Sequence, residues 1–137
     1  MDDPRAVLER QLKALNAHDL DALADTFHED LRSEDFIHPS QTFVGRDQVV
    51  RNWQLVISQV PDLKAELLGS AVEGDTVWSE WRMYGTHRGG TMFDVCGVTV
   101  SKVRDGRIAA SRRYLAPIEQ GTETVDDYFR RLVEPAG

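Results

Sequence analysis

The sequence predicts an α+β fold in which helices come first and a curved antiparallel sheet follows. Apolar residues recur at helical spacing up to Pro61, and after it they form strand-length runs separated by three turn signals. The chain has 137 residues, of which 41% are hydrophobic and 28% charged, as in an ordinary globular protein. A chain of this length can build a core of its own, so residues 1–137 are expected to form one domain.

Three helices are expected before Pro61. The first covers residues 4–17, because two aspartates precede a proline and apolar residues then follow at intervals of three and four. Asp19 is expected to cap a second helix, whose apolar stripe continues to Phe27. The third helix opens at Gly45 and closes at Pro61, since proline cannot continue a helix.

Strands are expected around these helices and after them. Residues 31–37 read as a short strand that stops at His38, because Pro39 disfavours a helical residue before it. Four strands of an antiparallel meander follow, separated by Glu-Gly-Asp, Arg-Gly-Gly and Arg-Asp-Gly-Arg, at residues 63–73, 76–87, 92–103 and 107–116. An amphipathic piece at residues 125–132 predicts a short C-terminal helix.

Charge and composition exclude several classes of partner. The net charge of −7, with no local cluster of Lys and Arg, disfavours nucleic acid and anionic membranes. No stretch approaches the roughly 18 apolar residues of a membrane span, and the acidic start does not read as a signal peptide, so a cytoplasmic protein is expected. Cys96 is alone and the four histidines lack ligand spacing, so we expect neither a disulfide nor a metal site.

Several segments together resemble the nuclear transport factor 2-like superfamily, in its SnoaL-like polyketide cyclase and ketosteroid isomerase-like branch. The resemblance covers roughly residues 5–117 and rests on LNAHDLDALADTF, on His38-Pro39 with FVGRD, on Gly85-Thr86-His87 and on Asp105-Gly106-Arg107-Ile108. It implies a cone-shaped curved sheet, the cystatin-like α+β barrel, around a deep apolar cavity, and a homodimer formed through the outer sheet face. Because enzymes and plain binding proteins share this cone, the fold alone selects no activity.

The known activities of the superfamily are poorly matched. The carboxylate base of a ketosteroid isomerase falls on His38, its oxyanion Asp near Val98 and its first-helix Tyr near Gln11, so the acidic donors that stabilise a dienolate are absent. In epoxide hydrolases of this superfamily an Asp positions the attacking water, and the corresponding residue here is Arg113, which cannot act as that base. The last-strand Asp of many polyketide cyclases corresponds to Ala116.

His38 and Arg113 are the candidate catalytic residues, with Asp35 as a third. An imidazole titrates near about 6.5, so His38 could move a proton at neutral pH, oriented by Asp35, Glu34 or Asp94. Alternatively, His38 only bonds the nearby backbone. The resemblance sends Arg113 inward, where it would meet a carbonyl or anionic ligand, or else form an internal salt bridge to Asp94 or Glu34.

Strand alternation predicts which side chains face the interior. Val77, Trp81 and Met83 read as buried, which leaves Glu80 and Arg82 as a same-side ion pair on the outer face. The candidate substrate-binding residues are Gln11, Phe36, Trp53, Trp81, Met83, Asp94, Cys96 and Val98. The aromatic residues, Met83 and Cys96 are most simply core residues that could also line a cavity, and Asp94 could instead be the partner of Arg113. The expected dimer face consists of Trp78, Arg82, Tyr84, Thr99 and Tyr114.

Two functions from different classes remain open at this point. The first is a cofactor-independent enzyme of the cyclase, isomerase or dehydratase kind, in which His38 moves a proton alpha to a carbonyl while Arg113 or Gln11 holds the enolate oxygen. The second is a non-catalytic protein that binds a small hydrophobic molecule or uses its dimer face for interaction. The first requires His38 to face the cavity.

Overall fold

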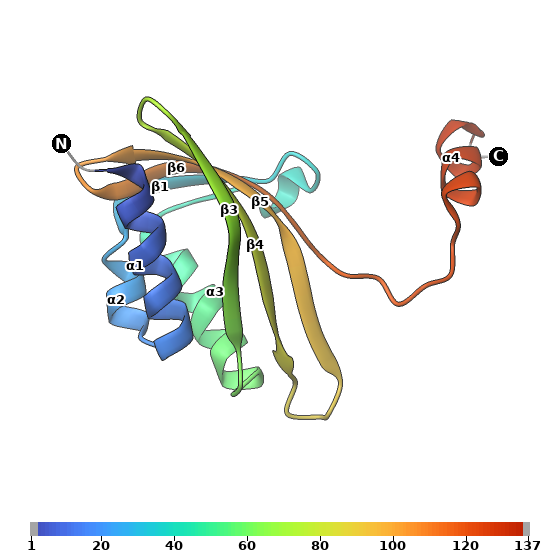
Figure 1. The fold of residues 1–137 in the computed structure, drawn as a ribbon, viewed down its shortest axis with the longest axis horizontal. Coiled ribbons are helices and arrows are strands. Elements are labelled where there is room, and N and C mark those ends of the chain that lie inside the picture. The colour runs from blue at the N-terminus through green and yellow to red at the C-terminus, as the bar shows by residue number, and fades with distance from the viewer. Residues whose placement is uncertain (1–2, 136–137) are drawn as a thin grey trace.

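A single curved sheet covered on its concave side by helices forms the body of the protein (Figure 1). The computed structural model describes residues 3–135. Its helices are α1 (Pro4–Ala17), α2 (Leu20–Ala24), α3 (Arg46–Gln59) and α4 (Val125–Val133), with a short 3-10 turn, η1 (Pro39–Gln41). Its strands are β1 (Phe27–Glu34), β2 (Phe43–Val44), β3 (Lys64–Glu73), β4 (Thr76–Thr86), β5 (Met92–Arg104) and β6 (Arg107–Pro117).

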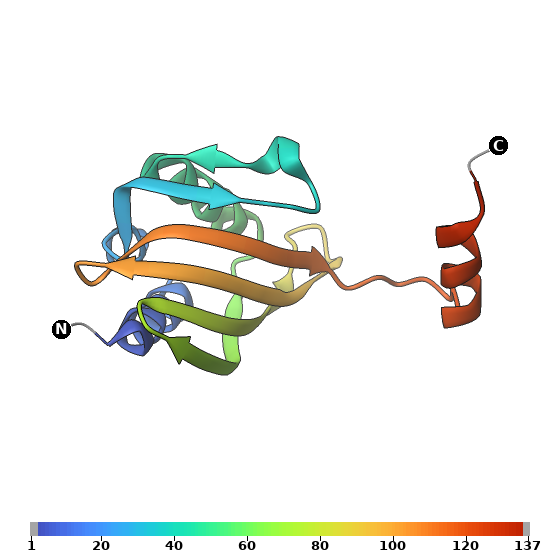
Figure 2. The same cartoon turned by 90° about the horizontal axis from the view of Figure 1, so that it is seen from above.

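The six strands lie in the order β2-β1-β6-β5-β4-β3, which Figure 2 shows from above. The predicted α+β class and the antiparallel meander of β3 to β6 are confirmed. One pairing differs from the expected antiparallel sheet, because β1 runs parallel to β6. The long crossover through α3 and the meander brings β6 back beside β1 in that direction.

The boundaries of the first two helices follow from their caps. Asp3 accepts a hydrogen bond from the backbone N–H of Arg5, and α1 ends at His18 in the left-handed conformation, with φ 55°. The predicted extension of α2 to Phe27 is wrong. The helix stops after five residues, and Phe27 instead begins β1, where it pairs with Ile108 of β6.

Close contact between β5 and β6 shapes the curved sheet. Gly97 of β5 has φ +149°, and a Cβ atom at this position would overlap the carbonyl oxygen of Tyr114. Only glycine permits this approach of the two backbones. The strands can therefore stay paired from Val95–Pro117 to Arg104–Arg107 around the concave face, with one register shift after Lys102.

The hydrophobic core lies between the concave face and helices α1 to α3. Its most enclosed members come from α1, β1 and the start of β3 and β4, and include Leu8, Leu31, Leu63 and Val77. Burying such a side chain contributes about 1.5–3 kcal/mol. Beyond the end of β6, residues 118–124 lead away from this body to α4, which stands apart in both views (Figures 1 and 2).

Candidate ligand-binding site

A cavity of about 260 Å³ opens between the concave face of the sheet and the helices. Its volume is slightly below the usual range for sites of drug-sized ligands, so it suits a compact molecule. Most of its wall is apolar, and the lining residues are Gln11, Leu15, Leu23, Phe27, Leu31, Ser33, Phe43, Val49, Asn52, Trp53, Val56, Trp81, Met83, Thr99, Ser101, Ile108, Ser111, Arg113 and Leu115. The structure therefore brings the sequence-predicted residues Gln11, Trp53, Trp81, Met83 and Arg113 to one cavity.

Arg113 is the one charged side chain in the described wall. Its Nε donates to the hydroxyl of Ser33 at 2.7 Å, and its Nη2 donates to the carbonyl oxygen of Gln41 at 2.7 Å. Burial lowers the pKa of the guanidinium below its ordinary value, and the negative charge of Asp35 partly opposes this effect. An arginine remains protonated even so, which leaves a fixed cation in a mostly apolar cavity.

The internal salt bridge considered for Arg113 is absent from the described residues. Asp94 pairs instead with Arg82 across β4 and β5 at 3.1 Å, and Glu34 pairs with Arg32 at 2.9 Å. Neutral oxygens thus hold Arg113 in position without neutralising its charge.

Hydroxyl groups from neighbouring strands form two polar rows on the concave face. In the first row, Ser33, Ser111 and Ser101 stand opposite one another on β1, β6 and β5, and Ser111 donates to Ser33 at 3.2 Å. In the second, the hydroxyls of Ser79 and Thr99 lie 2.7 Å apart, and Thr99 stands opposite Arg113. The cavity therefore combines apolar walls with a polar floor.

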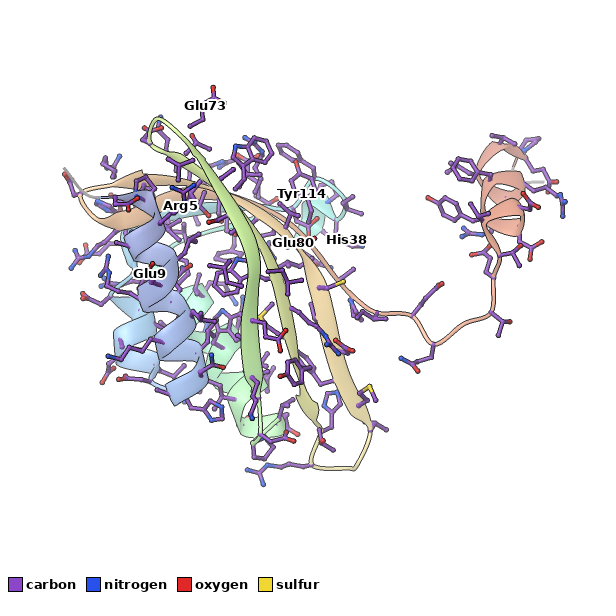
Figure 3. The ribbon with its side chains drawn as sticks, in the orientation of Figure 1. Arg5, Glu9, His38, Glu73, Glu80 and Tyr114 are labelled. Carbon is purple, nitrogen blue, oxygen red and sulfur yellow. The ribbon has the colours of Figure 1, made fainter. Side chains whose placement is uncertain are left out.

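The pair of His38 and Asp35 lies outside the cavity wall. The side chain of His38 is 50% exposed and its Nδ1 lies 3.5 Å from the carboxylate of Asp35, which also accepts the backbone N–H groups of Ile37 and His38. Figure 3 shows His38 on the far side of the sheet from helix α1. The expectation that His38 faces the cavity is therefore corrected, because residues 35–38 form a turn that closes on the carboxylate of Asp35.

The pKa of Asp35 reflects this turn. Burial raises the pKa of the carboxyl group, but the backbone N–H of His38, the His38 side chain and the N–H of Ile37 together bring it below its ordinary value. Asp35 is thus held as a carboxylate, which makes it a weak base.

Four predicted substrate-binding residues do not reach the cavity. Asp94, Cys96 and Val98 lie on the outer side of β5, where Asp94 bonds Arg82 and Cys96 is exposed, while Phe36 is 57% exposed after the end of β1. The prediction placed the even-numbered residues of β5 on the inner face, whereas the odd-numbered residues Thr99 and Ser101 line the cavity. An error of one residue in strand alternation moves every side chain to the opposite face. Their assignment to the site is corrected accordingly.

The same shift explains two errors at the expected dimer face. Thr99 lines the cavity and does not belong to the outer face. The outward direction of Glu80 and Arg82 is confirmed, as is the burial of Val77, Trp81 and Met83, but the partner of Arg82 is Asp94 on the next strand rather than Glu80.

Sequence reasoning missed the three serines of the first polar row. One signal could have found Ser101: the charged residues Asp94, Lys102 and Arg104 share one parity along β5, which places the odd-numbered residues inside. Ser33 and Ser111 carry no such signal, because their meeting depends on the parallel pairing of β1 with β6.

Comparison with known proteins assigns the family. The sequence model of the SnoaL-like domain matches residues 8–111, which is most of the chain. The chain therefore belongs to the SnoaL-like family, as the sequence resemblance predicted. A search of the curated proteins finds no match.

Solved structures with the same fold include IdmH from Streptomyces antibioticus, a proposed polyketide cyclase. It is 24% identical with a TM-score of 0.70, covering 85% of this chain and 92% of IdmH. A proposed SnoaL-like polyketide cyclase from Jannaschia sp. CCS1 is also 24% identical, with a TM-score of 0.68 and coverage of 82% and 84%. A protein with the ketosteroid isomerase-like fold from Catenulispora acidiphila, solved with trimethylamine, is 21% identical, with a TM-score of 0.67 and coverage of 79% and 83%.

Two further features of residues 3–135 bear on the sequence predictions. Within this part of the chain, no three His, Cys, Asp or Glu side chains are grouped so that they could hold a metal ion. None of its helices combines the length and the apolar character that crossing a membrane requires.

Proposed function

We propose that this protein binds a hydrophobic, carbonyl-containing small molecule and acts on it in the manner of a polyketide cyclase. The observation that carries the proposal is Arg113, the one cation in the described wall of a mostly apolar cavity, and its Nη1 has no protein partner among the described residues. A carbonyl or enolate oxygen is the complement of such a group, since a charge-assisted hydrogen bond in a dry cavity is stronger than one in water.

The proposed chemistry needs a stabilised enolate more than a strong base. When a carbon next to a carbonyl group loses its proton, negative charge moves onto the carbonyl oxygen, and Arg113 would hold that oxygen. No carboxylate or imidazole belongs to the described cavity wall, so water or a basic group of the substrate itself must accept the proton. His38 has no catalytic role in this proposal. Its contact with the carboxylate of Asp35 instead stabilises the turn that leads into η1.

Ligand binding and α-proton exchange of 2-tetralone, a bicyclic ketone, test the proposal. Titration followed by tryptophan fluorescence reports on Trp53 and Trp81 in the wall, and proton NMR in D₂O measures exchange. Arg113→Gln should weaken binding about 10- to 100-fold and abolish any protein-dependent exchange, because hydrogen bonds to charged groups contribute about 1.5–3 kcal/mol. Arg104→Gln, on the outer side of β5, is the control. Failure of the wild type to bind any bicyclic ketone contradicts the proposal.

A non-catalytic binding protein is the second candidate, favoured by the absence of a carboxylate and an imidazole from the described wall. The same experiment separates the two functions. Tight, Arg113-dependent binding with exchange no faster than in buffer would identify a binder.

We further propose that two copies of the chain associate. The outer aromatic patch, formed by Phe36, Trp78 and Tyr114, leaves 57%, 45% and 37% of these residues exposed. In the same chain, helix α4 presents an exposed apolar stripe formed by Val125, Tyr128, Phe129, Leu132 and Val133.

A second copy is the occupant that fits both surfaces. A helix of nine residues is marginal alone, so its stripe needs a packing surface, and the course of residues 118–124 leads α4 away from its own sheet (Figure 1). Charge complementarity supports this partner. Arg112 lies over the ring of Phe36 and forms no ion pair among the described residues. Asp126, in the first turn of α4, forms none among them either.

A further inference from the structure

We infer that the ligand carries a second oxygen function, remote from the oxygen held by Arg113, and that Ser101 and Gln11 recognise it. The inference rests on the proposed function and names the class of ligand. A compact fused bicyclic hydroxy ketone, with a carbonyl at one end and a hydroxyl at the other, has the required chemistry.

Ser101 and Gln11 are buried polar side chains that have no hydrogen-bond partner among the described residues. Ser101 is 2% exposed, Gln11 is 8% exposed, and both line the cavity. Neither side chain makes a hydrogen bond to another described residue. No fully enclosed polar side-chain atom of the described residues lacks a partner, so the polar atoms of these two are not fully enclosed, and the cavity that both residues line is the space next to them.

These two side chains are expected to form hydrogen bonds. Leaving a buried amide or hydroxyl unsatisfied is unfavourable, so ordered water or a ligand must meet them. The other hydroxyls of the floor already have partners: Ser33 accepts from Arg113 and Ser111, and Ser79 accepts from the indole Nε1 of Trp81 at 2.9 Å. Ser101 and Gln11 are thus the groups left free for recognition.

The strand order separates these groups from the Arg113 end. Arg113 lies on β6 beside β1, Ser101 lies on β5, and Gln11 comes from α1, which packs against β3 and β4. The direct partner of Ser101 on β6 is Ser111, two residues from Arg113, and such diagonal neighbours on adjacent strands lie about 7–8 Å apart. Two fused six-membered rings with an oxygen at each end span approximately this distance, and they are compact enough for a small cavity.

The hydrogen-bonding capacities define the two ends of the ligand. A guanidinium only donates, so the ligand must accept at Arg113. A serine hydroxyl and a glutamine amide both donate and accept, so the second function can be a hydroxyl that does both. A hydrocarbon end would leave Ser101 and Gln11 unsatisfied, and the site should therefore discriminate against it.

The test compares 2-tetralone with 6-hydroxy-2-tetralone, which differ only by the second oxygen. The wild type should bind the hydroxy ketone about 5- to 10-fold more tightly, the gain expected for one neutral hydrogen bond. Ser101→Ala and Gln11→Met, which removes the amide at nearly constant length, should each bring this ratio toward 1. Ser58→Ala on the exposed face of α3 should preserve it. Thermal unfolding establishes that each variant is folded.

The outcomes distinguish this inference from the proposed function. Equal affinity of the wild type for both ketones, or a ratio that survives in both variants, overturns the inference while the role of Arg113 stands. If neither ketone binds, the proposed function falls and this inference falls with it.

Discussion

The side chain of Asp35 is the clearest case of a single residue whose charge is tied to the fold. Its carboxylate accepts the N–H groups of Ile37 at 3.0 Å and His38 at 2.8 Å, and its pKa lies below the ordinary value of 3.8. The unfolded chain therefore takes up this proton first as the pH falls. The stabilisation is present above the unfolded pKa and is lost as the pH falls through the folded pKa.

Asp35→Asn should accordingly flatten the pH dependence of stability. Between about pH 5 and pH 2, the free energy of unfolding should fall less steeply in the variant than in the wild type. Chemical denaturation at several pH values measures this slope. Asp30→Asn, an exposed position on β1, is the matched control, and identical slopes for the wild type and Asp35→Asn would refute the assignment.

Single residues also show how far the site could be predicted. The inward direction of Arg113, Trp81 and Met83 followed from alternation and the family resemblance, and the structure places all three in the cavity wall. Alternation failed on β5, because valines occur on both of its faces and the apolar pattern alone does not set the phase. For His38, the following Pro39 was visible in the sequence, but the expected strand end at residue 37 was wrong, because β1 ends at Glu34 and the direction of the imidazole depends on the turn around Asp35.

Among the elements, strand β5 depends most on one position. Gly97→Ala should lower the free energy of unfolding by more than about 2 kcal/mol, since the left-handed conformation and the contact with the Tyr114 carbonyl both oppose a side chain. Gly69→Ala in β3 is the control, because a Cβ there meets nothing within 4 Å. Denaturant unfolding compares the two, and equal stabilities would contradict this account of the close approach.

Element boundaries were predictable where local chemistry sets them. The ends of α1 and the turns between β3, β4, β5 and β6 follow from caps, prolines and Gly-containing turns, and they lie within a residue or two of the expected positions. The start of β1 was misplaced because Phe27 also fits a helical stripe. Phe27 belongs to the strand because it pairs with Ile108, which is far away in the sequence.

For the whole molecule, the proposed association predicts a concentration-dependent dimer. Sedimentation velocity should show dimers at micromolar concentration, and Phe129→Asp should raise the dissociation constant more than tenfold, because burying this side chain contributes about 1.5–3 kcal/mol. Arg130→Gln on the polar face of α4 is the control. A wild-type monomer throughout this range would refute the association, and a dimer indifferent to Phe129→Asp would place the contact elsewhere.

The sequence by itself determined the α+β class, the succession of helices and meander, and the family, because these depend on periodicity, caps and turns that are local in the chain. Only the tertiary structure decided which side chains share the cavity. Ser33 and Ser111 meet through a parallel pairing of strands 78 residues apart, and Ser101 joins them through the phase of β5. Such pairings are non-local, and a shift of one residue would exchange the cavity floor for the outer face.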